Sequence, residues 1–508
     1  LAVLHSKHQC LRLLGLFNKV LIVDEVHACD AYMQGVLESL LEFHARAGGS
    51  AILLSATLPG RMKQALLDAF ASGCRVEAPA LQLGSQTPYP LVTGWSAAAA
   101  EKALETPLAT RSDVRRSLAV RYVSEQSAVV AGITAALDAG KCVCWMRNTV
   151  ADALDAHALF KGRLSDEKLT LFHARFTLHD RLVTEGKVLA CFGKDSTPEL
   201  RTGRLVIATQ VAEQSLDADW DLVVSDLAPI DRLIQRAGRL QRHPRDAEGR
   251  RLRDPKDRDQ RGQPCLWVFG PPWADEPAAN WFKVAFPKAA GVYPHHGQPW
   301  LSAKALQTGR FAMPGDARQM IEGVFGDESE IPEGLQANAN LAEGEGYADA
   351  STAQQNTVKL VTGYERGGID WWSEAKTPSR LGEASMNVLL ARWEGEQLRP
   401  WVAGKHGWAY SSLRVAERLI ARTAEPVAAA RKAVFAALLE TLPNKGQWSV
   451  LLALEETPEG WVGEAWSTPA GKSEVLGRWQ YSDECGLREV TAPSGCPPGA
   501  APQKRGTY

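Results

Sequence analysis

The sequence predicts an α/β protein built on parallel sheets, and three observations lead to this prediction. Residues 20–23 are a short β-branched and aliphatic run followed by two acids, which is typical of a buried parallel strand that ends at a ligand-binding edge. From about residue 125 to residue 269, short apolar runs alternate with amphipathic, helix-like stretches. Most of the 16 tryptophans fall after residue 265, so the composition changes there and indicates a further domain.

The composition is that of an ordinary globular protein of 508 residues, with 45% hydrophobic residues and a net charge of −2. A nearly neutral chain binds nucleic acid only through a local basic groove, so its overall charge does not decide that question. The nine cysteines are scattered without a CxxC pair, which argues against a disulfide framework or a zinc site and favours reduced thiols and a cytoplasmic location. No signal peptide or membrane span is visible, and we expect no membrane partner.

The acids after the first strand are the first candidate site. Asp24 and Glu25 stand at its carboxyl end, where one carboxylate can hold Mg²⁺ and its neighbour can orient or deprotonate a water that attacks a nucleotide. We assign the metal to Asp24. His27 follows two positions later and can link this phosphate site to a facing domain. The alternative is an ordinary strand with an acidic turn.

A second strand follows a helix expected over residues 33–45. The run 51–54 ends in Ser55 and Thr57, and a further helix is expected from about residue 61 to residue 70. We expect the two hydroxyl side chains to couple the nucleotide state to domain closure. Capping of the next turn remains the alternative for either hydroxyl.

The middle of the chain reads as a parallel sheet with interleaved helices. We expect strands over residues 142–146, 169–172, 205–208, 222–224 and 265–269, and helices over 125–139, 150–160, 181–190 and 230–240. The last helix is expected to carry three cleft-facing residues, Gln235, Arg239 and Arg242. Gln235 and Arg239 are spaced i, i+4 and share one face, and Arg242 follows about one turn later. Two arginines so placed suit a γ-phosphate, and the alternative is a solvated basic face.

These motifs occur in the order DEVH, SAT, ATQ and QxxGRxxR, which resembles that of motifs II, III, V and VI of helicase superfamily 2. Longer stretches, including "LIVDEVHACDAYM", "FHARFTLHDR" and "DRLIQRAGRLQRH", resemble the CRISPR-associated helicase–nuclease of type I systems, most closely the subtype I-E form. The resemblance is dense over residues 1–270 and thinner beyond them.

The resemblance implies tandem RecA-like domains, of which the first is partial, followed by a linker and an α+β C-terminal domain. It further implies ATP and Mg²⁺ between the RecA-like domains, single-stranded DNA on the strand edge, and recruitment by the Cascade effector complex with its guide RNA. Asp217 would contact the ribose or hold the closed state, although Ser215 stands where the superfamily usually has glycine. The expected DNA-facing residues are His173, Arg175, Thr209 and Gln210.

The predicted domain boundaries follow the composition along the chain. They give a partial first RecA-like domain (1–85), a second (86–275), a helical or flexible linker (276–375), an accessory domain (376–491) and a disordered tail (492–508). Within them, we expect a mobile, solvated charged loop over residues 243–263 and a flexible stretch over 326–357. In the accessory domain we expect strands over 381–402, 449–454 and 461–466 and a helix over 412–441. Just before it, we expect Trp371 and Trp372 to be core or base-stacking residues.

Two features lead us to expect an amino-terminally truncated fragment. The chain begins with Leu1 within an apolar helical pattern, and no GxxxxGK[ST] phosphate loop or HD nuclease domain precedes Asp24. The leading hypothesis is therefore the ATPase motor of a DNA-translocating helicase, inactive as an isolated piece. The alternatives are a non-catalytic module that binds single-stranded DNA or docks on Cascade, and a DExH-type RNA helicase.

Overall fold

The computed structural model describes residues 2–6, 8–81, 88–111, 114–213, 216–254, 257–327, 329–360, 381–442, 446, 449–468 and 473–490. The chain divides into two compact units, which we treat separately. The first comprises residues 1–173 and 185–382, and the second comprises residues 174–184 and 383–508. Our expectations for Ser215, Trp371, Trp372 and the tail 492–508 lie outside the described residues.

The first unit begins with a parallel pair of strands, β1 (Val20–Val23) and β2 (Ser50–Leu53). After α1 (Gln9–Leu16), the helices α2 (Ala31–Arg46) and α3 (Gly60–Cys74) pack with this pair around a buried apolar cluster. The other face is open, since Val20 is 58% and Ile22 is 62% exposed. The expectation that residues 20–23 form a buried strand was wrong for the open face, because the helices α2 and α3 cover only the other face of the β1–β2 pair.

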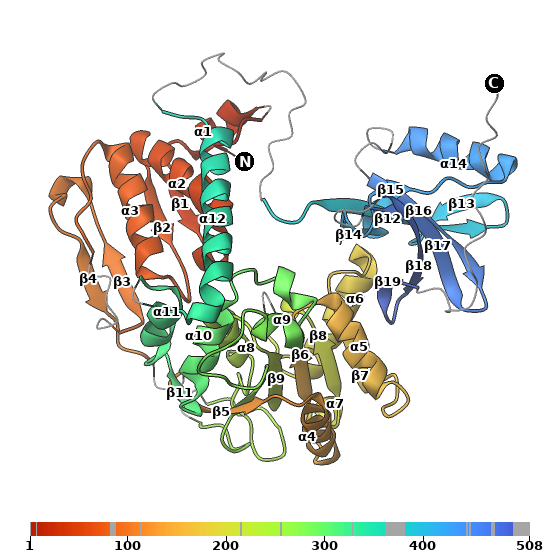
Figure 1. Cartoon of the computed structure of the whole chain (residues 1–508), viewed down its shortest axis with the longest axis horizontal. Helices are drawn as coiled ribbons and strands as arrows, with labels where there is room; N and C mark the ends of the chain where they lie inside the picture. Colours follow the sequence, from red (N-terminus) through yellow and green to blue (C-terminus); the bar gives the residue numbers. More distant parts are fainter. Residues whose placement is uncertain are drawn as a thin grey trace. The chain divides into compact units, whose positions relative to one another are not determined.

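The second part of this unit is a seven-stranded sheet in the order β11-β5-β10-β9-β6-β8-β7. All neighbours pair in parallel except β11 with β5. The strands are β5 (Arg116–Val123), β6 (Val143–Met146), β7 (Leu169–Phe172), β8 (Leu205–Ala208), β9 (Leu222–Asp226), β10 (Cys265–Phe269) and β11 (Arg310–Met313). The helices between β5 and β10 are α4 (Gln126–Asp138), α5 (Val150–Phe160), α6 (Leu178–Phe192), α7 (Pro198–Arg201) and α8 (Ile230–Ala237). The expected parallel α/β architecture is confirmed (Figure 1).

Several elements were missed in segments that looked like connections. A hairpin, β3 (Leu91–Gly94) with β4 (Leu104–Pro107), precedes β5, and the late strand β11 closes the sheet edge. The charged stretch 243–263 is also not simply solvated, because Arg245 is fully buried and Arg261 nearly so. Both arginines pair with buried acids, a tertiary arrangement that the mixed charges of the sequence do not reveal.

The expectation of a flexible stretch over residues 326–357 was wrong. After α9 (Trp281–Ala285), α10 (Gly297–Leu306) and α11 (Ala317–Phe325), the chain forms a 24-residue helix, α12 (Glu333–Asn356), which packs beside α2 (Figure 1). The two helices approach each other closely at Gly35: a Cβ built on this glycine would lie 2.9 Å from Cβ of Ala353. Small residues therefore replace the large apolar side chains whose scarcity had suggested disorder.

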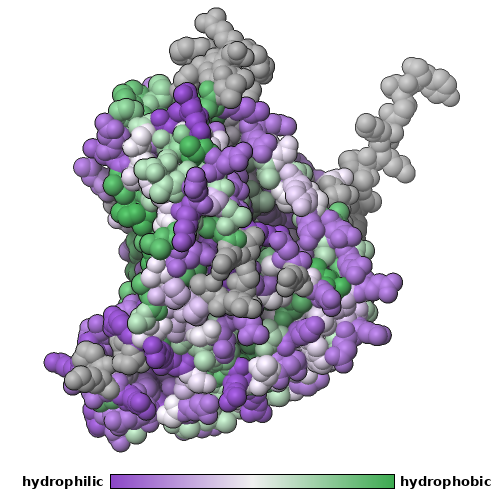
Figure 2. Space-filling model, turned by 90° about the vertical axis from the view of Figure 1, so that its left-hand side faces the viewer, coloured by the Kyte–Doolittle hydropathy of each residue, from purple (hydrophilic) through white to green (hydrophobic). Residues whose placement is uncertain are grey.

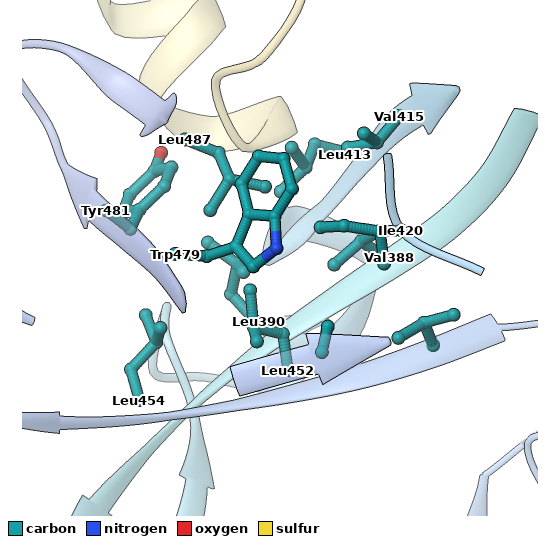
Figure 3. Packing of buried hydrophobic residues seen from close by; sticks show 12 residues of the cluster. Val388, Leu390, Leu413, Val415, Ile420, Leu452, Leu454, Trp479, Tyr481 and Leu487 are labelled. Carbon is teal, nitrogen blue, oxygen red and sulfur yellow. The ribbon is translucent and has the colours of Figure 1, made fainter. Parts of the chain in front are cut away.

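The second unit contains a sheet of eight strands in the order β13-β12-β16-β17-β18-β19, with β14 on β12 and β15 on β17. The elements are β12 (Ser385–Glu394), β13 (Gln397–Pro400), α13 (Gly407–Tyr410), β14 (Ser412–Ala416), β15 (Arg422–Thr423), α14 (Ala429–Thr441), β16 (Ser449–Thr457), β17 (Gly460–Ser467), β18 (Val475–Ser482) and β19 (Gly486–Glu489). A long helix over 412–441 was therefore a wrong prediction. Leu413 and Val415 alternate inward from β14 toward Trp479, which is a strand period (Figure 3).

Among the described residues, no helix combines the length and the apolar character needed to cross a bilayer. On the face that Figure 2 shows, apolar residues lie among polar ones.

Candidate functional site

The acids Asp24 and Glu25 lie where β1 gives way to a short 3-10 turn, Val26–Ala28. Both are exposed, and an oxygen of Asp24 accepts a hydrogen bond of 2.9 Å from the backbone N–H of Glu25. Glu25 has φ +54°, in the left-handed region that non-glycine residues seldom adopt. The backbone therefore turns sharply here, and both carboxylates stand at the strand's carboxyl edge.

His27 is the centre of the site. Its Nδ1 lies 3.0 Å from Oγ of Ser55, and its Nε2 lies 2.5 Å from Nε2 of Gln235. The same Nε2 is 3.3 Å from a carboxylate oxygen of Glu25. One imidazole thus brings together residues from after β1, from after β2 and from α8.

The contacts of His27 indicate a neutral imidazole. Its side chain is only 3% exposed, and burial lowers its pKa from 6.5, although the charge of Glu25 opposes this. A neutral ring with the proton on Nδ1 can donate to Ser55 and accept the carboxamide N–H of Gln235 at Nε2. Burial thus favours the neutral ring that the contact with Gln235 requires and that the contact with Ser55 permits.

The predicted arginines do not lie on the helix of Gln235, so this part of the prediction was wrong. The helix α8 ends at Ala237, and Arg239 and Arg242 follow on a loop, residues 238–243, which we call the arginine loop. Gly238 caps the helix, and Gln241 has φ +45°. The expected i, i+4 relation of Gln235 and Arg239 is therefore lost, and tertiary contacts hold the two arginines instead.

Both arginines contact the segment that follows β8. Nη2 of Arg239 donates to the carbonyl of Glu213 at 2.6 Å, and Nε of Arg242 donates to Oδ1 of Asp217 at 2.8 Å. His243 also contacts Asp217, at 3.0 Å. Partial burial would raise the pKa of Asp217, but hydrogen bonds and charges from Arg242 and His243 lower it below its usual range. Glu25 is among the acids whose charge opposes the lowering of the Arg239 pKa by burial.

A buried ion pair beneath the arginine loop escaped the sequence analysis. Arg236 and Glu213 are both fully buried and lie 2.6 Å apart. Arg236 also donates to Ser225 at 2.8 Å and to the side-chain oxygen of Asn148 at 3.2 Å. The one sequence signal for a buried Arg236 was its position directly after Gln235. Neighbouring residues of a helix point in different directions, so Arg236 points away from the side that carries Gln235. The pair joins α8 to the loop after β8.

The four residues expected to face DNA have different environments. His173 is fully buried at the end of β7, and Thr209 is almost fully buried after β8. The side chain of Gln210 donates to the carbonyl of Asn148 at 2.7 Å. Arg175 belongs to the second unit, where its carbonyl accepts from the backbone N–H of Leu487 at 2.8 Å. Their role toward DNA stays a prediction, and the burial of His173 and Thr209 suits support of the edge better than direct contact.

The acids fit a magnesium site that is completed by phosphate. Within the described ranges, no group of three or more His, Cys, Asp or Glu side chains is placed to hold a metal. Mg²⁺ in nucleotide sites usually takes one or two carboxylates and completes its shell with phosphate oxygens and water. The exposed Asp24 suits this arrangement, with Ser55 and Thr57 on the neighbouring segment; the hydroxyl of Ser55 accepts from the backbone N–H of Thr57 at 3.3 Å.

Comparison with known proteins identifies relatives of the chain. Residues 139–245 match the family model described as the C-terminal part of the CRISPR-associated nuclease/helicase Cas3. The Cas3 endonuclease/helicase of Escherichia coli is 39% identical over 251 residues, which is 48% of this chain and 27% of that protein. The Thermus thermophilus Cas3 is 31% identical over 438 residues, or 78% of this chain and 42% of the relative. The chain therefore spans less than half the length of these relatives.

Solved structures give the same result for the fold. The crystal structure of T. fusca Cas3 matches with a TM-score of 0.75 and 26% identity, covering 96% of this chain and 55% of that one. A T. fusca Cas3 structure with AMPPNP matches with a TM-score of 0.75 and 27% identity, over 96% and 56% of the two chains. A chain of a CRISPR RNA-guided surveillance complex in a pre-nicking state matches with a TM-score of 0.72 and 27% identity, over 96% and 59%. In sequence and in structure, the chain is similar to part of the Cas3 family of CRISPR-associated nuclease/helicases.

Proposed function

We propose that the chain is part of an ATP-dependent motor that moves along single-stranded DNA in type I CRISPR interference. The observation that carries the proposal is the contact of His27 with Gln235, 2.5 Å apart, which joins the acidic turn after β1 to the helix before the arginine loop. A motor of this class needs acids from one domain and arginines from the next on either side of one nucleotide.

Each residue has a distinct proposed role in hydrolysis. Bound Mg²⁺ and ATP would supply the polarised γ-phosphate. Asp24 would hold the metal, and Glu25 would orient and deprotonate the attacking water. Arg239 and Arg242 would bind the γ-phosphate oxygens, which requires Arg242 to exchange its exposed pairing with Asp217 for the phosphate. Asp217 would then be free to accept a hydrogen bond from the ribose.

The proposed coupling to DNA runs through residues that sense the closed state. His27 contacts Ser55 and Gln235 at the same time. A movement of the second domain at Gln235 would therefore be passed through His27 to the segment Ser55–Thr57. The segments with His173, Arg175, Thr209 and Gln210 would hold the DNA edge, with Arg175 contributing a phosphate contact. The similarity to a chain of an RNA-guided surveillance complex supports recruitment by such a complex.

The test is ATP hydrolysis by the complete gene product that contains these residues, with and without single-stranded DNA. We expect DNA-dependent hydrolysis, and a loss of at least about 10³-fold for Arg239→Ala. Asp24→Asn should lose activity similarly while circular dichroism and the unfolding midpoint stay unchanged. Glu77→Gln, an exposed acid on the same domain, is the matched control and should retain activity. Unchanged turnover in Asp24→Asn and Arg239→Ala would refute the assigned roles.

A second candidate rests on a sequence fact: these 508 residues contain no GxxxxGK[ST] loop. Under this alternative, the chain acts without turnover, as a module that holds single-stranded DNA or docks on the effector complex. We expect little or no ATPase from residues 1–508 alone under either reading. DNA-stimulated hydrolysis by the complete gene product favours the motor, whereas tight DNA binding without any hydrolysis favours the module. Preference for RNA over DNA in the same assay would favour an RNA helicase.

A further inference from the structure

The arginine loop lacks regular secondary structure, so its shape must come from contacts with other segments. The helix before it ends at Ala237, and Gln241 adopts φ +45° without being glycine. A residue keeps such a conformation only where its surroundings impose it. The contacts that impose it come from two places far apart in the sequence: Arg116 and the segment Asp219–Trp220.

Arg116, the first residue of β5, binds the carbonyl end of α8. Its Nη2 donates to the carbonyl of Ala237 at 2.7 Å. Its Nη1 donates to the carbonyls of Leu240 at 2.5 Å and Gln241 at 3.3 Å. The last carbonyls of a helix have no partners within the helix, and a guanidinium with several N–H donors can serve one of them, that of Ala237, together with two carbonyls of the loop. One side chain thus fixes where the helix stops and how the loop leaves it.

Asp219 and Trp220 hold the other side of the loop. Oδ1 of Asp219 accepts from the backbone N–H of Arg242 at 2.7 Å. The backbone of Trp220 donates to the carbonyl of Arg239 at 3.2 Å and accepts from the N–H of Gln241 at 2.8 Å. The backbones of both candidate arginines are therefore bonded directly to this pair of residues.

Asp219 is itself fixed by buried charges. It is fully buried, and Oδ2 accepts from Nε of Arg245 at 2.7 Å and from Nη1 of Arg261 at 3.1 Å. Arg201 approaches the same oxygen to 3.4 Å. A buried carboxylate with several charge-assisted hydrogen bonds has little freedom to move. If it moved away from one of its arginines, that buried charge would lose its partner, which costs free energy. This anchor lies next to the arginine loop.

We propose that Arg116 and Asp219 are positioning residues that set the arginine loop so that Arg239 and Arg242 meet the γ-phosphate together. The proposal rests on the proposed function for the phosphate. Neither residue is placed to touch the nucleotide; each acts through the backbone of residues 237–242. The loop is thereby held before any nucleotide binds, so no ordering cost falls on the binding step.

The first test uses hydrogen exchange in the 508-residue chain without nucleotide. In Arg116→Met, the amides of residues 240–242 should exchange at least about tenfold faster, while those of β6 and β9 keep their protection. Arg116→Lys, which retains the charge but not the fork, should lie between that variant and the unaltered chain. Arg121→Met is the matched control: Arg121 lies on the same strand, is exposed and packs on Trp267. Unchanged exchange at residues 240–242 in Arg116→Met would overturn the proposal.

The second test uses DNA-stimulated ATP hydrolysis by the complete gene product. Arg116→Met should lower kcat at least about tenfold, and its effect should be smaller in the Arg242→Ala background, where only Arg239 is left to position. A merely structural role would instead give the same fold-loss in both backgrounds, and that result would overturn the proposal. An unaltered protein without DNA-stimulated hydrolysis would refute the proposed function. The exchange experiment would still decide whether Arg116 holds the loop.

Discussion

Nε2 of His27 lies 2.5 Å from Nε2 of Gln235, although 208 residues separate them in the sequence. The imidazole is buried on the far side as well, where Nδ1 meets Ser55 at 3.0 Å. Both ring nitrogens of His27 thus have partners, one on the segment after β2 and one on α8. This double engagement makes it the best single point at which to perturb the contact.

The first prediction concerns that contact. Gln235→Leu keeps the side-chain volume but removes the amide donor, and His27→Ala removes the acceptor. Because one hydrogen bond contributes about 0.5–1.5 kcal/mol net, Gln235→Leu should lower DNA-stimulated ATPase by up to about tenfold. The double variant should be no worse than His27→Ala, as measured by a double-mutant cycle on kcat. Additive losses would show that the two residues act separately.

The second prediction is a dependence of stability on pH. Burial lowers the pKa of His27 below 6.5, so the folded chain binds a proton there less readily than the unfolded chain. Its contribution is therefore fully present above pH 6.5 and is lost as the pH falls through the lowered pKa. Urea unfolding at about pH 7.5 and about pH 5.5 should show a smaller loss on acidification for His27→Gln than for the unaltered chain. Equal losses would contradict the assignment, since His5, His243 and His296 titrate in both proteins.

The third prediction tests the buried ion pair. Arg236→Met leaves Glu213 buried without its main partner, which should cost about 3–5 kcal/mol of unfolding free energy. The variant Glu213→Leu with Arg236→Met removes both charges and should recover much of that loss, because no unpaired charge remains. Urea unfolding followed by tryptophan fluorescence measures both changes. A single variant that costs under about 1 kcal/mol would mean that water or another group takes over the contact.

The fourth prediction concerns the start of α6 in the second unit. The hydroxyl of Tyr481 donates to Oδ2 of Asp180 at 2.6 Å and accepts from the backbone N–H of Thr177 at 2.9 Å. Tyr481→Phe removes the acceptor of the buried N–H of Thr177, while Oδ2 of Asp180 keeps the donors Thr177 Oγ1 and Trp401 Nε1, and the change should cost about 1–3 kcal/mol. Tyr410→Phe is the control, since Tyr410 is 39% exposed, and it should change the unfolding free energy little. Equal effects of both substitutions would contradict the role of the hydroxyl.

The regular elements of the second RecA-like domain were predictable because each has a clear period. The buried runs 143–146 and 205–208 are continuous and apolar, as parallel strands covered on both faces must be. The contact partners of the motif residues were not predictable, because they depend on segments far apart in the sequence. Arg116 lies before the first strand predicted for this domain, and nothing local connects it with the carbonyl of Leu240.

Two errors share a physical cause. The helix of Gln235 was predicted to run to residue 240 because the local pattern stays helical, but it ends at Ala237, where Arg116 and Asp219 bind the segment that follows. The stretch 412–441 was read as one helix because apolar residues recur in it, yet Leu413 and Val415 follow a strand period that pairing with β12 selects. In both cases tertiary partners override a weak local preference.

The open face of the β1–β2 pair has a practical consequence for anyone who purifies this chain. Val20, Ile22, Ile52 and Leu54 offer neighbouring aliphatic side chains to water, and among the described residues β1 and β2 form a sheet of these two strands alone, so each has an unpaired edge. In concentrated solution such a surface favours self-association and the binding of other apolar molecules, so the binding of a hydrophobic dye and light scattering should rise with protein concentration. Replacing Ile22 or Ile52 by threonine should reduce this association while leaving the apolar cluster on the opposite face of the strands intact.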